Sequence, residues 1–355
     1  MAFTADEIND INVGALENYI DKGKVWKQNV ANKPMLEAFD KAAGRFSGGK
    51  DYVSVAVKSG QGGGSLQGYS GDDQVGYYNP TGRKRARSPW KEHHIGMVIT
   101  HTELKVDGID IDDTPGDEDT RPMDGREAHA LVNLFDEKLD DLGEDYAFSM
   151  NRLVHGDGSA DPKALAGILS ILSDNPTTGT ALGISRVTNT WWRNDYRTTA
   201  GGNAISSATT DGGALIEAMD QAARRRSKYR NGQTRIRYFA GTDFIDAYKK
   251  ELRANGNYTM TGWKGGKPDG SMEDPMHAGL PLEWDPTMDD LGYSKRCYAI
   301  DFGKTGLKLL YMDGQRMKKH NPARPYDRYV MYNGITTTAV MMAKQLNTSG
   351  VYEIS

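Results

Sequence analysis

A long amphipathic segment constrains the fold of this chain more than any other feature. From Asp124 to His155 the apolar side chains recur at steps of three and four residues, namely Leu131, Leu134, Phe135, Leu139, Leu142, Tyr146, Met150 and Leu153. This spacing predicts one α-helix with a single apolar face. Asp124 and Glu127 form a D-x-x-E capping pattern at its start, and Gly156 closes it. About 30 helical residues would span roughly 45 Å, so we expect this helix to support the whole subunit.

A glycine-rich excursion separates two predicted strands upstream of that helix. DYVSVAVK (51–58) alternates in the manner of a strand, and WKEHHIGMVITHTELKVDG (90–108) predicts a second, longer strand. Between them, KSGQGGGSLQGYSG (58–71) contains six glycines. A phosphate-binding glycine loop should open a helix, and no helix begins here. The segment therefore predicts an extended, flexible hairpin arm.

Four basic residues, Arg83, Lys84, Arg85 and Arg87, lie on the return side of this arm. One interpretation is a solvated basic tip. The other is an arm that lies over a neighbouring subunit and pairs with its acidic surface, because contacts between arginine and carboxylate can fix the register of such an arm. The sequence leaves both interpretations open.

Several apparent ligand motifs have simpler explanations. GRFSGGKD (44–51) has Asp51 where a nucleotide-binding loop needs Ser or Thr, so we do not expect a nucleotide site. On one extended strand His93 and His101 would lie about 26 Å apart, too far to share a metal ion. The acidic stretch 107–124 predicts a solvated loop, with a divalent ion at a subunit contact as the alternative.

Composition narrows the class of protein. The formal net charge of −4 argues against a dedicated DNA reader. Cys297 is the sole cysteine, which excludes an internal disulfide framework. We find no signal peptide at the start and no apolar run of membrane-spanning length, and so expect a soluble protein that folds in a reducing cytoplasm.

The remaining chain predicts mixed helices and strands. PMLEAFDKAAGRF (34–46) predicts a helix with Pro34 in its first turn. DGGALIEAMDQAARRR (211–226) predicts another helix, and Thr242 is the expected N-cap of a third. CYAIDFGKTGLKLLYM (297–312) and DRYVMYNGITTTAVMMAKQL (327–346) predict long strands near the end. Trp191 and Trp192 are expected in the core.

The order of these parts resembles the major capsid proteins of tailed bacteriophages, which share the Hong Kong 97-like fold. GISRVTNTWWRN, RYFAGTDFIDAYKKEL and GLKLLYMDGQRMKK also look similar to one branch of that family. The resemblance covers nearly the whole chain. It implies an α+β capsid fold with an N-terminal arm (1–50), an extended loop with its flanking strands (51–105), a peripheral domain with the long helix (106–160), an axial α/β domain (161–320) and returning C-terminal strands (321–355).

The resemblance also implies a function. The chain would be a non-catalytic shell subunit without cofactors, forming hexamers and pentamers of an icosahedral phage head around double-stranded DNA. It would assemble in the bacterial cytoplasm with a separate scaffolding protein, a portal and a decoration protein, and be locked without covalent crosslinks. The candidate inter-subunit contacts are Lys58, Gly62, Gly63, Gly64, Arg83, Lys84, Arg85, Arg87, Asp112, Asp113 and Glu118.

Two alternatives remain at the level of sequence. One is the shell protein of an encapsulin-type nanocompartment with the same fold, which would enclose an enzyme instead of DNA. The other is a metal-dependent hydrolase that uses the acidic stretch 107–124, with activity that depends on Asp110 or Asp112. Particle contents separate the first alternative from a phage head, and a small compact oligomer would favour the second.

Overall fold

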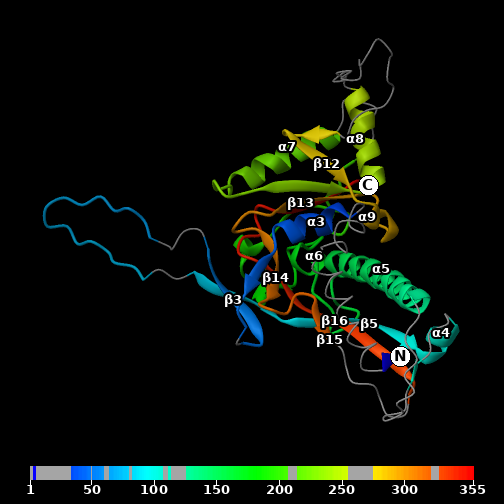
Figure 1. Ribbon diagram of the computed structural model, residues 1–355. Coiled ribbons are helices and arrows are strands. Elements are labelled where there is room, and N and C mark those ends of the chain that lie inside the picture. Colours follow the sequence, from blue (N-terminus) through cyan, green and yellow to red (C-terminus); the bar gives the residue numbers. More distant parts are fainter. Residues whose placement is uncertain are drawn as a thin grey trace. The chain divides into compact units, whose positions relative to one another are not determined.

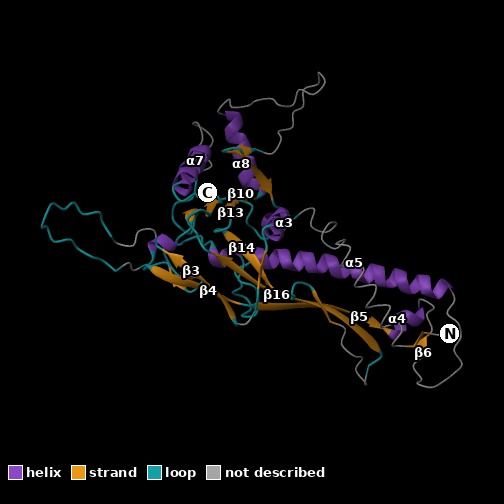
Figure 2. Cartoon of the chain, turned by 60° about the vertical axis from the view of Figure 1, so that its left-hand side comes forward, coloured by secondary structure: helices purple, strands orange, loops and turns teal. Residues whose placement is uncertain are grey.

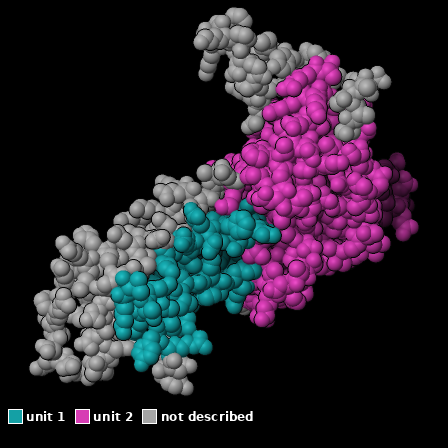
Figure 3. Space-filling view, turned by 90° about the vertical axis from the view of Figure 1, so that its right-hand side faces the viewer, with its two compact units in different colours: residues 1–32, 92–152, 311–339 teal, residues 33–91, 153–310, 340–355 magenta. Residues whose placement is uncertain are grey.

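The chain divides into two compact units, which Figure 3 shows in different colours. The computed structural model describes residues 3–4, 33–48, 50–59, 64–79, 82–106, 111–112, 125–206, 214–254, 275–320 and 328–355, with the side chains of 3–4, 111–112, 125–137 and 140 left undescribed. Unit 1 comprises 1–32, 92–152 and 311–339, and unit 2 comprises 33–91, 153–310 and 340–355. The five-part division expected from the sequence stays a prediction.

Unit 1 is built around strands and the long helix. Its elements are β1 (Phe3–Thr4), β5 (Lys91–Thr100) from residue 92, α4 (His101–Val106), β6 (Ile111–Asp112), α5 (Gly125–His155) as far as residue 152, β15 (Lys318–His320) and β16 (Val330–Ala343) as far as residue 339. Strand β16 pairs with β5 and, antiparallel, with β15. β1 and β6 form a separate parallel pair.

Helix α5 confirms the long helix predicted from the apolar spacing. It runs for 31 residues and ends at His155, one residue before Gly156. Its buried side chains include Leu139, Leu142, Tyr146 and Met150, which recur at steps of three and four. The hydroxyl groups of Tyr146 and Thr337 lie 2.8 Å apart and join the helix to β16 within unit 1. Figure 2 shows α5 as one long helix.

The predicted strand over 90–108 is wrong beyond Thr100. The strand β5 ends there and α4 begins at His101. The cause is a capping box: the Thr100 N–H donates to Glu103 Oε2 (3.1 Å), and the Glu103 N–H donates to Thr100 Oγ1 (3.2 Å). The bond from the Thr100 N–H also lowers the pKa of Glu103. His93 and His101 therefore do not share a strand face.

Unit 2 carries the larger sheet and most of the helices. Its elements are α3 (Pro34–Lys41), β2 (Gly44–Phe46), β3 (Tyr52–Lys58), β4 (Arg83–Pro89), α6 (Ile168–Ile171), β7 (Thr180–Ala181), β8 (Ile184–Ser185), a 3₁₀ turn (Thr190–Trp192), β9 (Asp195–Arg197), α7 (Ala214–Ser227), β10 (Ile236–Ala240), α8 (Thr242–Ala254), β11 (Met276–His277), β12 (Leu280–Trp284), α9 (Pro286–Asp290), β13 (Arg296–Asp301), most of β14 (Leu307–Met312), the end of β16 and β17 (Gly350–Glu353).

A six-stranded mixed sheet organises unit 2, in the order β11-β12-β10-β13-β17-β9. β10 runs parallel to β12 and antiparallel to β13, and β17 runs antiparallel to β13 and parallel to β9. Helices α7 and α8 pack against each other and against this sheet (Figure 1). Among the described helices, none is long and apolar enough to cross a membrane.

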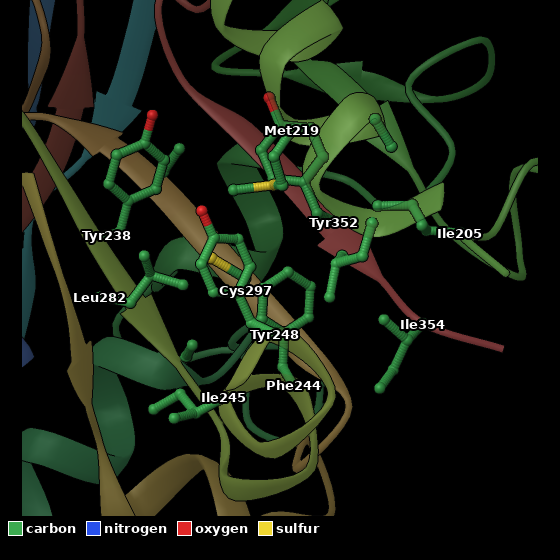
Figure 4. Close-up of a cluster of buried hydrophobic side chains, with 14 of the residues drawn as sticks. Ile205, Met219, Tyr238, Phe244, Ile245, Tyr248, Leu282, Cys297, Tyr352 and Ile354 are labelled. Atoms are coloured by element: carbon green, nitrogen blue, oxygen red, sulfur yellow. The ribbon is translucent and has the colours of Figure 1, made fainter. Parts of the chain in front are cut away.

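Between these helices and the sheet lies an apolar cluster (Figure 4). Met219 of α7, Phe244 and Tyr248 of α8, Cys297 of β13 and Tyr352 of β17 are all buried there. Side chains from both helices and from neighbouring strands thus exclude water together, and this burial is the main source of stability of unit 2.

Two local predictions in unit 2 have different outcomes. Pro34 starts α3 as expected. Thr242 does not act as an N-cap, because it is itself the first helical residue and its N–H donates to Asp289 Oδ1 at 2.9 Å. A carboxylate from α9 therefore binds the start of α8.

Of the two tryptophans that were expected in the core, Trp192 is buried and Trp191 is half-buried.

Candidate functional site

The predicted hairpin arm is present in unit 2. β3 and β4 pair antiparallel along their full lengths, from Tyr52 opposite Pro89 to Lys58 opposite Arg83. The Ser59 N–H donates to the Gly82 carbonyl at 2.9 Å and continues the ladder. Figure 2 shows the loop of 64–79 extending from the ends of these strands. The described residues of the stretch, 58–59 and 64–71, are therefore part of a hairpin, as predicted, and none of them opens a helix.

Five basic side chains gather on this hairpin. Lys58 of β3 is exposed, as are the four basic residues of β4 at positions 83, 84, 85 and 87. Lys58 lies directly opposite Arg83, and like charges in such a pair are destabilising. Arg87 lies over the Tyr52 ring, 5.3 Å from its centroid. The described part of the chain gives none of these five a carboxylate partner, so the hairpin presents free positive charge.

The base of the hairpin is fixed to the rest of unit 2. Val53 and Val57 of β3 and Ala86 of β4 are buried, whereas Val55, between the two buried valines, is half-buried. The Arg87 N–H donates to the Leu182 carbonyl in the β7–β8 turn at 2.8 Å. The strands of the arm are therefore packed and hydrogen-bonded against other residues of unit 2.

The loop beyond the hairpin exposes large apolar side chains. Leu66 and Tyr77 are essentially fully exposed, at 105% and 96%, and Tyr69 and Tyr78 are exposed by 71% and 59%. Scattered exposed apolar residues are normal, but several on one loop, together with Val75, form the kind of surface that is typical of an interaction site.

Glycine has an identifiable purpose at two positions of this loop. Gly71 has φ +56°, in a turn where the Ser70 N–H donates to Asp73 Oδ2 at 2.9 Å. At Gly64 a Cβ atom would lie only 2.0 Å from the Tyr78 ring. A side chain at residue 64 would therefore have to displace the exposed Tyr78 ring from across the loop.

The other predicted contact residues are placed less completely. Gly62, Gly63, Asp113 and Glu118 lie outside the described residues. Asp112 ends β6 in unit 1, where it pairs with Thr4. Of the acidic stretch 107–124, the structure describes only the backbone of 111–112. The hydrolase hypothesis rests on residues outside that description.

The sequence reading missed an acidic face on α5. Asp141, Glu144 and Asp145 are exposed at steps of three and four residues, and Phe148, one turn further, is 49% exposed. In the sequence these residues give no separate signal, because a helix with one apolar face is expected to carry polar residues on the opposite face. Within the described ranges, no group of three His, Cys, Asp or Glu residues is placed to hold a metal ion.

Comparison with known proteins identifies solved structures that are similar to this chain. No protein-family model matches the sequence, and no curated protein matches it. Among solved structures, the capsid asymmetric unit of cyanophage A-1(L) is similar with a TM-score of 0.62 at 15% identity, over 92% of this chain and 94% of that one. The capsid of the Myoviridae phage XM1 gives 0.52 at 12% identity, over 93% and 94%. The mature capsid of bacteriophage PhiM1 gives 0.51 at 8% identity, over 89% and 86%.

These similarities extend over nearly the whole of each chain. They show that the chain has the α+β, Hong Kong 97-like capsid fold, as the resemblance implied.

Proposed function

We propose that this chain is a major capsid protein, a structural subunit that self-assembles into hexamers and pentamers of an icosahedral phage head around double-stranded DNA. The observation that carries the proposal is the similarity in fold to the cyanophage A-1(L) capsid, which spans more than nine-tenths of both chains. A protein that shares a fold over nearly its whole length is expected to share its mode of assembly.

In this proposal the hairpin arm reaches across an adjacent subunit. Its free positive charge and its exposed aromatic loop have no purpose in an isolated chain, and both would be covered in a shell. Each contact is weak alone, but a closed assembly repeats it many times. Lys58, Arg83, Lys84, Arg85 and Arg87 are the contact residues that we propose from the described part of the arm.

The proposed partners follow from a virion location. The chain would assemble in the host cytoplasm with a separate scaffolding protein and a portal, with a decoration protein on the finished shell. Its role would be structural, without catalysis or cofactor. Locking between subunits would be non-covalent.

Negative-stain microscopy of the sedimenting fraction tests the proposal, after expression of this chain alone and with its genomic neighbours. Rings, tubes or closed shells are expected. Double-stranded DNA inside closed particles supports a phage head, whereas an enzyme cargo would point to a nanocompartment. A homogeneous monomer or small oligomer under both conditions would overturn the proposal.

A further inference from the structure

A basic pocket of about 610 Å³ lies in unit 2, distant in sequence from the hairpin. Five cationic residues line it: Lys41 of α3, Arg235, Arg237, Lys304 and Lys308. None of the described residues that line it is acidic. This concentration of positive charge contrasts with the formal net charge of −4 for the whole chain.

Three of these cations are free to bind a ligand. Arg237 is paired with Glu283, with its Nε donating to Oε1 at 2.9 Å, and Lys41 is paired with Glu37. By contrast, Arg235, Lys304 and Lys308 have no carboxylate partner among the described residues. Arg235 and Lys304 are exposed and Lys308 is half-buried, so all three side chains can reach an anion in the pocket.

The backbone around the pocket is held by a buried carboxylate. Asp301 is fully buried at the end of β13, and its Oδ1 accepts the N–H groups of Arg235 and Gly303, each at 2.8 Å. The Phe302 N–H donates to the Arg235 carbonyl at 2.8 Å. Asp301 thereby holds two turns together, one that contains Arg235 and one that contains Lys304. These backbone N–H groups satisfy Oδ1, whereas the buried Oδ2 of Asp301 has no hydrogen-bond partner among the described residues.

The free cations suit a ligand that carries several negative charges close together, such as a phosphate backbone. The fork of Arg237 already holds Glu283, and a free arginine fork binds phosphate as well as carboxylate. Two of the three free groups are lysines, which bind phosphate oxygens as point charges. The aromatic ring in the lining, Phe302, packs against Phe39 at 4.9 Å and Phe239 at 6.0 Å, so it is not free to stack on a base.

We infer that this pocket, which we call the phosphate pocket, binds the phosphate backbone of nucleic acid without reading its sequence. Arg235, Lys304 and Lys308 neutralise adjacent phosphates, and Asp301 is a positioning residue. The identification of this nucleic acid as packaged DNA rests on the proposed function. The affinity of the pocket for phosphate does not depend on that function.

Fluorescence anisotropy with a labelled DNA duplex of about 20 base pairs tests the inference on the full chain, over a series of salt concentrations. The triple variant Arg235→Gln, Lys304→Gln and Lys308→Gln should bind at least about tenfold more weakly at low salt. The slope of log K against log salt should fall by about 0.9 for each lost contact, hence by roughly 2 to 3.

A matched control removes the same charge elsewhere in unit 2. Lys250, Arg253 and Lys295 are exposed and do not line the pocket, so their triple replacement by Gln should leave the salt slope unchanged. Equal losses in both triple variants, or no loss in the first, would overturn the inference. Displacement of the DNA by polyglutamate as readily as by unlabelled duplex would also overturn it, and would indicate an acidic protein partner.

Microscopy of the same samples separates this inference from the proposed function. If the chain forms shells but the pocket variant has the same salt slope as the wild type, the phosphate pocket is refuted and the proposed function is not. Pocket-dependent DNA binding by a chain that forms no shells would refute the proposed function alone.

Discussion

The Nε2 atom of His155 lies 3.1 Å from Oδ2 of Asp285, and both side chains are buried. The other carboxylate oxygen, Oδ1, accepts the N–H of Thr287 at 3.0 Å and so caps α9. Asp285 thus joins the last residue of α5 to the start of α9 within unit 2. Buried polar groups that serve two elements are expensive to leave unpaired.

Replacement of Asp285 should therefore be strongly destabilising. Asp285→Ala removes the cap and leaves the imidazole of His155 without this partner, and we expect the free energy of unfolding to fall by about 3 to 5 kcal/mol. Asp285→Asn keeps an oxygen for the Thr287 N–H and should cost less. Urea denaturation of the unassembled chain measures both changes. Losses below about 1 kcal/mol in both variants would contradict this role.

His277 should make unit 2 sensitive to mild acid. Its Nδ1 lies 3.1 Å from the Tyr248 hydroxyl and its Nε2 lies 3.7 Å from Asp220 Oδ1, and the side chain is buried. Burial lowers its pKa, and the nearby Arg226 lowers it further, while Asp220 raises it by less than burial lowers it. The folded chain consequently binds this proton less readily than the unfolded chain.

The sign of the pH dependence follows from that difference. The stabilisation is complete above the ordinary histidine pKa of about 6.5 and is lost as the pH falls through the lower folded value. His277→Gln should remove this dependence, so the difference in unfolding free energy between wild type and variant should shrink from about pH 7.5 to pH 5.5. A difference that stays constant, or grows in acid, would exclude His277 as the cause.

The Cys297 thiol should report on unfolding. It is fully buried in the apolar cluster of unit 2, and burial raises its pKa to about 12. Since the thiolate is the reactive form, a disulfide reagent should label the native chain very slowly at pH 8. In denaturant the same reagent should label one thiol per chain at once, because Cys297 is the sole cysteine. Rapid labelling of the native chain would show that the cluster opens locally.

The sequence predicted features that rest on local periodicity. The apolar spacing of α5 and the alternation of Val53 and Val57 each depend on residues a few positions apart, and both are confirmed. The helix α4 was missed although its signal was local, because the capping box of Thr100 and Glu103 follows directly on a strand pattern. Because apolar residues continue across Thr100, their spacing did not show where the strand ends and the helix begins.

Other features depend on contacts between distant residues, and these the sequence could not show. Asp301 accepts an N–H from Arg235, 66 residues away, and this contact shapes the phosphate pocket. Likewise, Asp289 binds the start of α8 from 47 residues away and takes the place expected for Thr242. Pairings of this kind are set by the strand order β12-β10-β13, which no spacing within the sequence encodes.

The hairpin arm provides the prediction that bears most directly on assembly. Deletion of 60–71 should leave the six-stranded sheet of unit 2 folded, because the described hydrogen bonds that root the arm lie at its base, as between Arg87 and Leu182. Particle formation should be impaired, since the loop would no longer reach a neighbouring subunit. Circular dichroism measures the fold, and sedimentation with negative-stain microscopy measures assembly.

A charge variant refines that experiment without shortening the chain. Replacing Arg83, Lys84 and Arg85 by Gln removes three exposed cations that have no carboxylate partner in the described chain, and it relieves the like-charge pair between Arg83 and Lys58. The isolated hairpin should therefore be no less stable, whereas assembly should weaken, because the lost charges would have met an acidic surface on the neighbour. For the wild type, assembly should also weaken at high salt, and the variant should be less salt-sensitive. Normal particles from both the deletion and the charge variant would show that the arm does not hold subunits together.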